Sequence, residues 1–329
     1  MVILAIPQAW ADMPLHFLYG TDAQALKPVA IIYFDNSTDI AHDRRTMIEG
    51  MIKEASQNLG LAIRNYVLPN EDTLPEQVEK IADDGIGMIV IIEPQKINAL
   101  AKIPSLYPDI DFTVIGVNTP LYLANVRSMV FRDQEGTYLM GVLAALRTKT
   151  GTIGFISKSD DETTRNLAYA FLQGAKRTNP DIMITEELGD KITHGTSTAS
   201  IPKSVQKSES KADITFVLDD ELLDSQIRTA GAQKKFIITY DHDLTNAYPG
   251  IVLTSLIKHY DLAIYHILRR YAQGQWRSGS QSMGVANSFL DYVLNNSNKA
   301  LMPKETIGQL EMNKDFISQN VLQINALGK

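Results

Sequence analysis

Polar, charged and aromatic side chains stand at or just after the ends of several short apolar runs in this 329-residue sequence. A carboxylate such as that of Asp241 offers two acceptor oxygens and no donor, and an imidazole such as that of His42 can stack or hydrogen-bond. The candidate ligand-binding residues are Asn36, His42, Asp43, Glu93, Asn118, Phe131, Ser157, Asp219, Tyr240, Asp241 and Lys258. Their chemistry suits the capture of a small molecule by hydrogen bonds and stacking.

Catalysis is not expected, because the patterns that enzymes need do not occur. The sequence has no cysteine, which excludes disulfides, thiolate catalysis and cysteine-based zinc sites. Its six histidines have no metal-ligand spacing. A P-loop, a Gly-x-Gly-x-x-Gly segment after a strand and a Gly-x-Ser-x-Gly nucleophile elbow are all missing. We therefore expect a non-enzymatic protein without a metal or cofactor.

The elements that would position these residues alternate between short apolar runs and helix-length amphipathic stretches. In the first half, strands are predicted over 28–34, 61–67, 87–92 and 112–117. After a helix over 134–147, a second series has strands over 152–156, 182–185, 214–218 and 236–240. A weakly amphipathic helix is predicted within 191–211, and Lys258 is expected to begin another helix. Such alternation predicts two α/β halves, each with a parallel sheet.

The carboxyl ends of parallel strands are where ligands bind in such sheets, because adjacent loops diverge there. Most of the candidate residues lie at or after the ends of predicted strands, so we expect a ligand cleft between the two halves. Several candidates have an ordinary structural alternative. His42 and Asp43 could cap a helix, Asp219 could cap the next helix, and Phe131 or Tyr240 could be core residues at a strand end.

Charge and the N-terminal segment bear on partners and location. The formal net charge is −7, the isoelectric point is near 5.4, and no basic stripe occurs, so a nucleic-acid partner is not expected. Residues 1–12 read as the tail of a secretory signal, with a small-x-small pattern at Ala9-Trp10-Ala11. A strand-like N-terminus is the alternative. No other stretch is apolar over the ~20 residues that a membrane span needs.

Four segments are similar to motifs of one known family. Residues 131–145 (FRDQEGTYLMGVLAA) resemble its "EGsyLaGylAa" helix, and residues 252–261 (VLTSLIKHYD) resemble its "vlTSvvKrvD" block. Residues 107–112 (YPDIDF) resemble "yPdvkF", and a glycine-containing unit over 151–181 resembles "GfvgG…f..G…a.nPd". The chain thus resembles the basic-membrane-protein (BMP, PnrA-like) family of ABC-transporter substrate-binding proteins, over about residues 28–290.

The resemblance implies an α/β, type I periplasmic-binding-protein fold, with two doubly wound parallel-sheet lobes and three hinge crossovers. Lobe one would comprise 28–149 plus 251–284, and lobe two 150–250 plus 285–329, after a signal remnant and N-terminal segment over 1–27. The lobes would close on the ligand about hinges near 148–151, 248–252 and 282–286.

The resemblance also implies a purine nucleoside or related ligand, delivered to the permease of an ABC importer. Asp241 would accept from the ribose hydroxyls, and Lys258 would meet a carboxylate or a ligand oxygen. A periplasmic receptor that signals to a membrane kinase or cyclase would share these features and stays open as the alternative. Members of the family are often lipid-anchored through an N-terminal cysteine. Because this sequence has no cysteine, a periplasmic protein without a lipid anchor is expected here. We also expect it to be a monomer.

Two segments depart from the family pattern. The loop after the first strand lacks the aromatic residue that stacks on the base, and it carries His42 and Asp43. The family commonly has small residues after the strand at 214–218, where this chain has Asp219, Asp220 and Glu221. If one of these acids points into the cleft, it favours a ligand with N–H or cationic groups over a neutral nucleoside.

Overall fold

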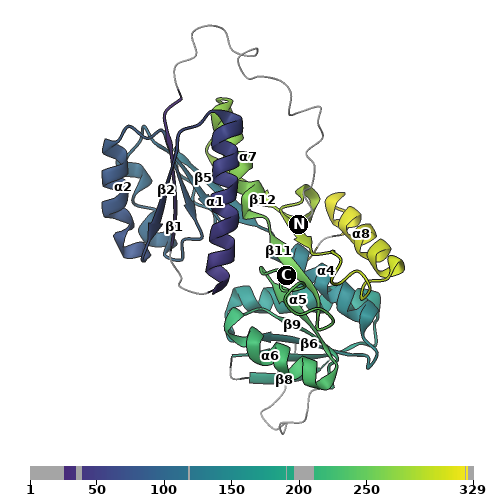
Figure 1. Ribbon diagram of the computed structural model, residues 1–329. Helices are drawn as coiled ribbons and strands as arrows, with labels where there is room; N and C mark the ends of the chain where they lie inside the picture. Colours follow the sequence, from purple (N-terminus) through teal and green to yellow (C-terminus); the bar gives the residue numbers. More distant parts are fainter. Residues whose placement is uncertain are drawn as a thin grey trace. The chain divides into compact units, whose positions relative to one another are not determined.

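The computed structural model describes residues 26–34, 39–117, 119–189, 191–195, 211–322 and 324, and the side chains of 39–44 and 191–195 lie outside that description. The chain divides into two compact units, which it enters and leaves at three points. Unit 1 comprises the residues up to Phe131 together with Tyr260–Ser282, and unit 2 comprises Arg132–His259 together with the residues from Met283 onward. Each unit holds one sheet with flanking helices (Figure 1).

Unit 1 is built on a six-stranded sheet with the order β12-β5-β4-β3-β1-β2, and the strands from β1 to β5 all pair in parallel. Its strands are β1 Val29–Phe34, β2 Ile63–Leu68, β3 Met88–Ile92, β4 Asp111–Ile115, β5 Val126–Phe131 and β12 Gly279–Met283. Its helices are α1 Asp39–Leu59, α2 Leu74–Asp83, α3 Ile97–Leu100 and α7 Tyr260–Ala272, with 3₁₀ turns at Glu71–Thr73 and Pro104–Leu106.

Alternation along the central strands explains the two layers of helix in unit 1. Ala30 and Ile32 of β1 point to one face, where they join a buried cluster with Val78 of α2. Their neighbours Val29 and Ile31 are equally buried and point to the opposite face, beside which α1 and α7 pack against each other (Figure 1). Because both faces are covered, the strands read as continuous apolar runs.

Unit 2 is built on a seven-stranded sheet with the order β13-β11-β10-β9-β6-β7-β8. Its strands are β6 Thr152–Ser157, β7 Met183–Leu188, β8 Lys191–Gly195, β9 Ile214–Val217, β10 Phe236–Tyr240, β11 Val252–Lys258 and β13 Leu290–Tyr292. Its helices are α4 Asp133–Arg147, α5 Glu162–Thr178, α6 Asp220–Gln233 and α8 Lys304–Ser318, with a 3₁₀ turn at Val285–Asn287. The outer strands β8 and β13 run antiparallel to their neighbours, and the rest are parallel.

All eight predicted strands are present, within one or two residues of most predicted ends. The helix predicted within 191–211 is wrong over 191–195, which form the edge strand β8, and residues 196–210 lie outside the described part. Lys258 ends β11 and does not begin a helix, because its apolar run pairs with β10 as a buried strand and α7 begins at Tyr260.

The unit boundaries differ from the predicted lobes at two elements. Helix α4 belongs to unit 2 because it packs against α5, and β11 belongs to unit 2 because it pairs with β10 and β13. The chain crosses between the units at 131–132, 259–260 and 282–283, of which only the last coincides with a predicted hinge.

The close packing of α4 on α5 depends on two glycines, one in each helix, that each contact the backbone of the other helix. A Cβ added to Gly141 would lie 2.0 Å from the carbonyl oxygen of Phe171, and one added to Gly174 would lie 2.0 Å from that of Tyr138. Both contacts are with backbone, which cannot rotate away as a side chain can. Only glycine therefore allows this helix pair to approach so closely.

Replacing either glycine should destabilise unit 2. We expect Gly141→Ala and Gly174→Ala each to lower the free energy of unfolding by about 1–3 kcal/mol, because the added methyl forces the helices apart. Chemical denaturation measures this as a lower midpoint at unchanged slope. The control is Gly308→Ala on α8, where nothing lies within 4 Å of the new Cβ, and helix propensity should stabilise it slightly. Equal midpoints for Gly141→Ala and Gly308→Ala would refute the packing argument.

Asp111, the first residue of β4, should make stability depend on pH. Burial raises the pKa of Asp111 from 3.8 to about 6, so the folded state binds this proton more tightly than the unfolded state. Stability should therefore fall as pH rises through this window. Asp111→Asn should remove that fall and stabilise the protein at pH 7 by about 1 kcal/mol, after allowance for solvent screening of a partly accessible group. Denaturation at pH 4.5 and 7 measures the difference, and parallel behaviour of both proteins would contradict it.

Candidate functional site

The strongest cluster of predicted ligand-binding residues lies in unit 2, where β10 and β11 end. Lys258 Nζ stands 3.8 Å from Asp241 Oδ2 and 3.8 Å from Asp133 Oδ2, and it lies 4.8 Å from the centroid of the Tyr240 ring. The sequence placed Tyr240, Asp241 and Lys258 among the candidates but missed Asp133, the first residue of α4. We call these four residues the acid–lysine cluster.

Parallel pairing and a left-handed turn bring Asp241 and Lys258 together. Tyr240 is in register with Leu256, and Asp241 follows with a positive φ of 61°. The backbone N–H of Asp241 donates to the carbonyl of Leu256 (2.6 Å), and its Oδ1 accepts from the backbone N–H of Lys258 (3.2 Å). Asn and Asp tolerate this region better than most residues, since their short polar side chains bond locally. The turn thus fixes the Asp241 carboxylate beside the lysine.

The acid–lysine cluster is buried and carries an excess of negative charge. The side chains of Asp133, Asp241 and Lys258 are only 14%, 7% and 13% exposed. Burial and the nearby Asp133 carboxylate raise the pKa of Tyr240 well above its ordinary value. Asp133 Oδ1 is buried, and no hydrogen-bond donor reaches it among the described residues. An acceptor left in this state is typical of a site that a ligand or water completes.

Two of the three acids after β9 bond to Lys158, and the third lies close to a histidine. Asp219 Oδ2 accepts from the backbone N–H of Lys158 (2.7 Å), and Lys158 Nζ forms an ion pair with Glu221. Asp220 Oδ1 lies 3.2 Å from Nε2 of the buried His242. Asp219 occupies the N-cap position of α6, but its side chain makes no bond to that helix, so the capping alternative is wrong in detail. These acids tie the loops after β6, β9 and β10 to one another.

Ser157, the last residue of β6, is the remaining candidate in unit 2. It is buried, and its Oγ accepts from the backbone N–H of Ser159 (3.1 Å). This bond shapes the loop in which Lys158 meets Asp219. Ser157 therefore supports the loop geometry at this edge of the sheet.

In unit 1, Glu93 is held in place at the end of β3. Its φ is 51°, its backbone N–H donates to the carbonyl of Ile115 (2.8 Å), and its carboxylate accepts from the hydroxyl of Tyr260. The buried ring of Tyr260 meets Phe131 edge to face at 4.9 Å. Gly116 leaves room here, since a Cβ would lie 3.0 Å from Glu93 Cγ. Sequence reasoning found Glu93 and Phe131 and missed Tyr260, whose aromatic type within a polar segment was the only signal.

The other predicted residues of unit 1 cannot be placed in the site. His42 and Asp43 lie within α1, near its beginning at Asp39, and their side chains are outside the described part. Asn36 and Asn118 lie outside the described residues altogether. Their binding roles remain predictions.

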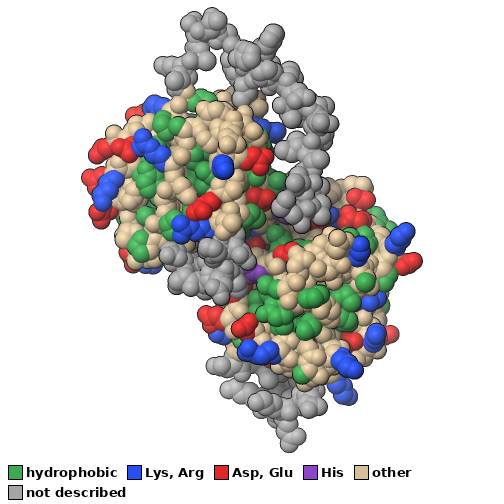
Figure 2. Space-filling model, in the orientation of Figure 1, with side chains coloured by type: hydrophobic (Ala, Val, Ile, Leu, Met, Phe, Trp, Pro, Cys, Tyr) green, Lys and Arg blue, Asp and Glu red, His purple; other side chains and the backbone are tan. Residues whose placement is uncertain are grey.

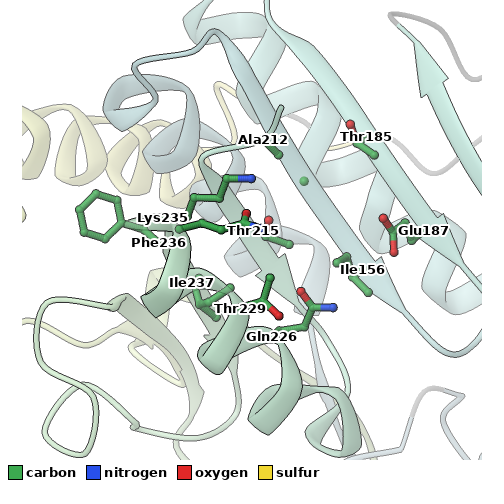
Figure 3. Close-up of a pocket in the computed structure, with 13 residues that line it drawn as sticks. Ile156, Thr185, Glu187, Ala212, Thr215, Gln226, Thr229, Lys235, Phe236 and Ile237 are labelled. Carbon is green, nitrogen blue, oxygen red and sulfur yellow. The ribbon is translucent and has the colours of Figure 1, made fainter. Parts of the chain in front are cut away.

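A separate cavity of about 190 Å³ lies on a face of the unit 2 sheet, between its strands and α6 (Figure 3). Ile156 of β6, Thr215 of β9 and Gln226 of α6 line it. The opposite sheet face is occupied by Phe155 and Phe216; Phe216 stacks with Phe171 of α5, and Phe155 meets the same ring at a tilt. None of the predicted ligand-binding residues lines this cavity, so it is distinct from the acid–lysine cluster.

Two further features of the described residues concern metal ions and membranes. In that part of the chain, no three His, Asp or Glu side chains gather closely enough to hold a metal ion. None of its helices combines the length and the apolar character that crossing a membrane requires. Acidic and basic side chains are interspersed over the visible face of each unit (Figure 2), with no continuous basic track there.

The fold matches solved structures at low sequence identity. A transcriptional activator of the comK gene from Bacillus halodurans superposes with a TM-score of 0.71, at 16% identity, covering 91% of this chain and all of that one. An ABC transporter solute-binding protein from Aeropyrum pernix gives a TM-score of 0.69, at 16% identity, covering 92% and 94%. The Lac repressor gives 0.54, at 13% identity, covering 86% and 87%. The fold is that of type I periplasmic binding proteins.

Curated relatives are similar over parts of the chain. Basic membrane protein A1 of Borrelia garinii is 34% identical over 144 residues, which is 42% of this chain and 37% of that protein. An uncharacterized lipoprotein of Pyrococcus furiosus is 22% identical over 290 residues, covering 83% and 72%. The alignments therefore span well under half of the Borrelia relative and most of the Pyrococcus one.

The sequence family described as ABC transporter substrate-binding protein PnrA-like matches residues 44–323, which include the acid–lysine cluster and the Glu93–Tyr260 contact. This match covers most of the chain and contains the blocks from which the resemblance was predicted. Its members are binding proteins and not enzymes. The chain belongs to the Bmp, PnrA-like family of ABC transporter substrate-binding proteins.

Proposed function

We propose that this protein captures a purine nucleoside or a related ribonucleoside for an ABC importer outside the cytoplasmic membrane. The observation that carries the proposal is the buried acid–lysine cluster at the carboxyl ends of β10 and β11. Ligands of open α/β sheets bind at such ends. The family and its transport-related description support the choice of an importer over other uses of the fold.

The geometry of the cluster suits a pair of neighbouring hydroxyl groups. Each hydroxyl can donate to a carboxylate and accept from an ammonium group, and the cluster supplies both. The 3.8 Å separations between Lys258 Nζ and the oxygens of Asp133 and Asp241 exceed hydrogen-bond length. Ribose oxygens could therefore bridge the Lys258 ammonium group and these two carboxylates.

Charge favours a neutral ligand over a phosphorylated one. Two carboxylates face one ammonium group, so a nucleotide phosphate would be repelled in this weakly solvated place. Because Asp219, Asp220 and Glu221 are already engaged with Lys158 and His242, they do not demand a cationic ligand. Both points support a nucleoside.

Closure of the units about the crossings at 131–132, 259–260 and 282–283 would present the captured ligand to a permease. The lipoprotein relative of Pyrococcus furiosus supports a location outside the cytoplasm. It also weighs against the unanchored form expected from the absence of cysteine. We propose that the protein acts as a monomer.

A sensory role is the second candidate, and the fold shared with the Bacillus halodurans transcriptional activator favours it. In that role, the ligand-bound protein would signal to a membrane kinase or cyclase. Uptake of radiolabelled nucleoside by cells with and without the gene separates the two. Loss of uptake supports transport, whereas unchanged uptake with a lost response to the nucleoside supports sensing.

Ribonucleosides should stabilise the protein against heat. We expect adenosine, guanosine or inosine at about 100 times its Kd to add about 2.7 kcal/mol, which raises Tm by several degrees. The 2′-deoxynucleosides should act more weakly because one hydroxyl is missing, and nucleoside monophosphates should have no effect. Differential scanning fluorimetry across this panel measures the shifts. A response to an unrelated solute with none to any ribonucleoside would overturn the nucleoside assignment.

The Asp241 carboxylate should carry much of the affinity. Asp241→Asn keeps the size and the tolerance of positive φ but removes the charge, so nucleoside affinity should fall by about 10- to 100-fold. Titration calorimetry gives the Kd of each protein. Asp224→Asn, an exposed position on α6, is the matched control and should bind normally. Full affinity in Asp241→Asn would remove the proposed ribose contact.

A further inference from the structure

A cluster of cations in unit 1 stands apart from the proposed nucleoside site. Arg127 lies near the beginning of β5, and His266, Arg269 and Arg270 lie in the last turns of α7. We propose that these residues form a binding site for a phosphate group, either free phosphate or the headgroup of an anionic lipid. This basic cluster does not depend on the acid–lysine cluster, which belongs to unit 2.

The basic cluster is built from three elements that hold one another. Arg127 Nη1 donates to the carbonyl of Arg277 (2.9 Å), and its Nη2 donates to Oε1 of Gln281 on β12. The side-chain amide of Gln281 lies 3.3 Å from Nε2 of His266. Gln281 therefore connects the strand arginine to the helix histidine. Such a chain of contacts positions the cations together.

The loop between α7 and β12 is also fixed. Arg270 Nη2 donates to the carbonyl of Gln275 (2.9 Å), and the indole N–H of Trp276 donates to Thr113 Oγ1 on β4 (3.0 Å). Arg277 Nη1 donates to the carbonyl of Gly274 (3.0 Å). Among the described residues, these arginines thus bond only to neutral oxygens, which orient them without neutralising them.

No carboxylate compensates this charge within the described part of the chain. None of Arg127, Arg269, Arg270 and Arg277 forms an ion pair there, whereas Arg64 elsewhere in unit 1 pairs with Asp84. The Nε atoms of Arg127 and Arg270 are buried and lack a hydrogen-bond partner. A buried donor in this state costs free energy unless other interactions offset it.

Burial and neighbouring cations both lower pKa values within the cluster. Burial lowers the pKa of Arg127, and the charge of Arg270 lowers it further. Burial likewise lowers the pKa of His266, and the charges of Arg270, Arg269 and Arg127 lower it further. Burial alone raises the pKa of Asp111 on the neighbouring β4, so this carboxylate is not paired with the arginines. An anion would relieve the repulsion.

The ordinary explanation covers only part of the cluster. Cations in the last turn of a helix are favoured by its dipole, which accounts for Arg269 and Arg270. It does not account for Arg127, which a different element brings to the same place and whose charge adds to theirs. The charges of Arg127, Arg269 and Arg270 all act on His266. A guanidinium group suits a phosphate, to whose oxygens it can donate two parallel bonds.

The first experiment uses His266 as a local reporter. In NMR titrations of the full protein, 10 mM inorganic phosphate should raise the pKa of His266 by about one unit relative to chloride at equal ionic strength. His266→Gln identifies the resonance. The double variant R269Q/R270Q should lose the phosphate response, and R64Q, with the same type of charge change, should keep it. A phosphate response that is missing in the wild type, or equal in the double variant, would overturn the free-phosphate site.

The second experiment tests the lipid source with vesicles of phosphatidylglycerol and of phosphatidylcholine. If a lipid headgroup is the ligand, wild type and R64Q should float with the phosphatidylglycerol vesicles and not with the phosphatidylcholine vesicles. R269Q/R270Q should float with neither. A phosphate response without flotation supports free phosphate. Failure of both experiments overturns the proposal. Circular dichroism and unchanged nucleoside binding show that the double variant is folded. Because nucleoside binding is measured separately, failure of the phosphate-site proposal can be told apart from failure of the proposed function.

Discussion

The pairing of β10 with β11 governs the chemistry of unit 2. Parallel strands end at the same edge of a sheet, so the residues that follow β10 meet the residues that end β11. The left-handed turn at Asp241 then directs a carboxylate toward Lys258, and backbone hydrogen bonds at both residues hold it there. Asp133 joins this pair because α4 begins at the same place. The acid–lysine cluster exists only while this pairing does.

Both units place a carboxylate residue with positive φ directly after a strand. Glu93 follows β3 and Asp241 follows β10, at φ values of 51° and 61°. A non-glycine residue in this region costs of order 1 kcal/mol, and it persists where several surrounding contacts hold the conformation. Hydrogen bonds with Tyr260 and Ile115 hold Glu93, and hydrogen bonds with Leu256 and Lys258 hold Asp241. Two such residues at strand ends support the proposal that a ligand binds at these edges.

The net charge of −7 conceals a separation of charge within the chain. Unit 2 buries two carboxylates against one ammonium group, whereas unit 1 gathers Arg127, Arg269 and Arg270 with no acid opposite them among the described residues. We propose that these arrangements select different ligands, one neutral and rich in hydroxyl groups, the other anionic. Charge composition alone predicts neither, because attraction depends on which charges are brought within a few ångströms.

Local sequence determined the strands, the two α/β series and the family, because apolar periodicity and short motifs are encoded by neighbouring residues. It also placed Tyr240, Asp241 and Lys258 among the ligand-binding candidates. Only the tertiary structure decided that Lys258 ends a strand, that residues 191–195 form an edge strand and that α4 belongs to unit 2. The partners of Asp133, of Asp219 and of Arg127 likewise could not be predicted from the sequence. Each depends on which strands pair and which helices pack, and these contacts join residues far apart in the chain.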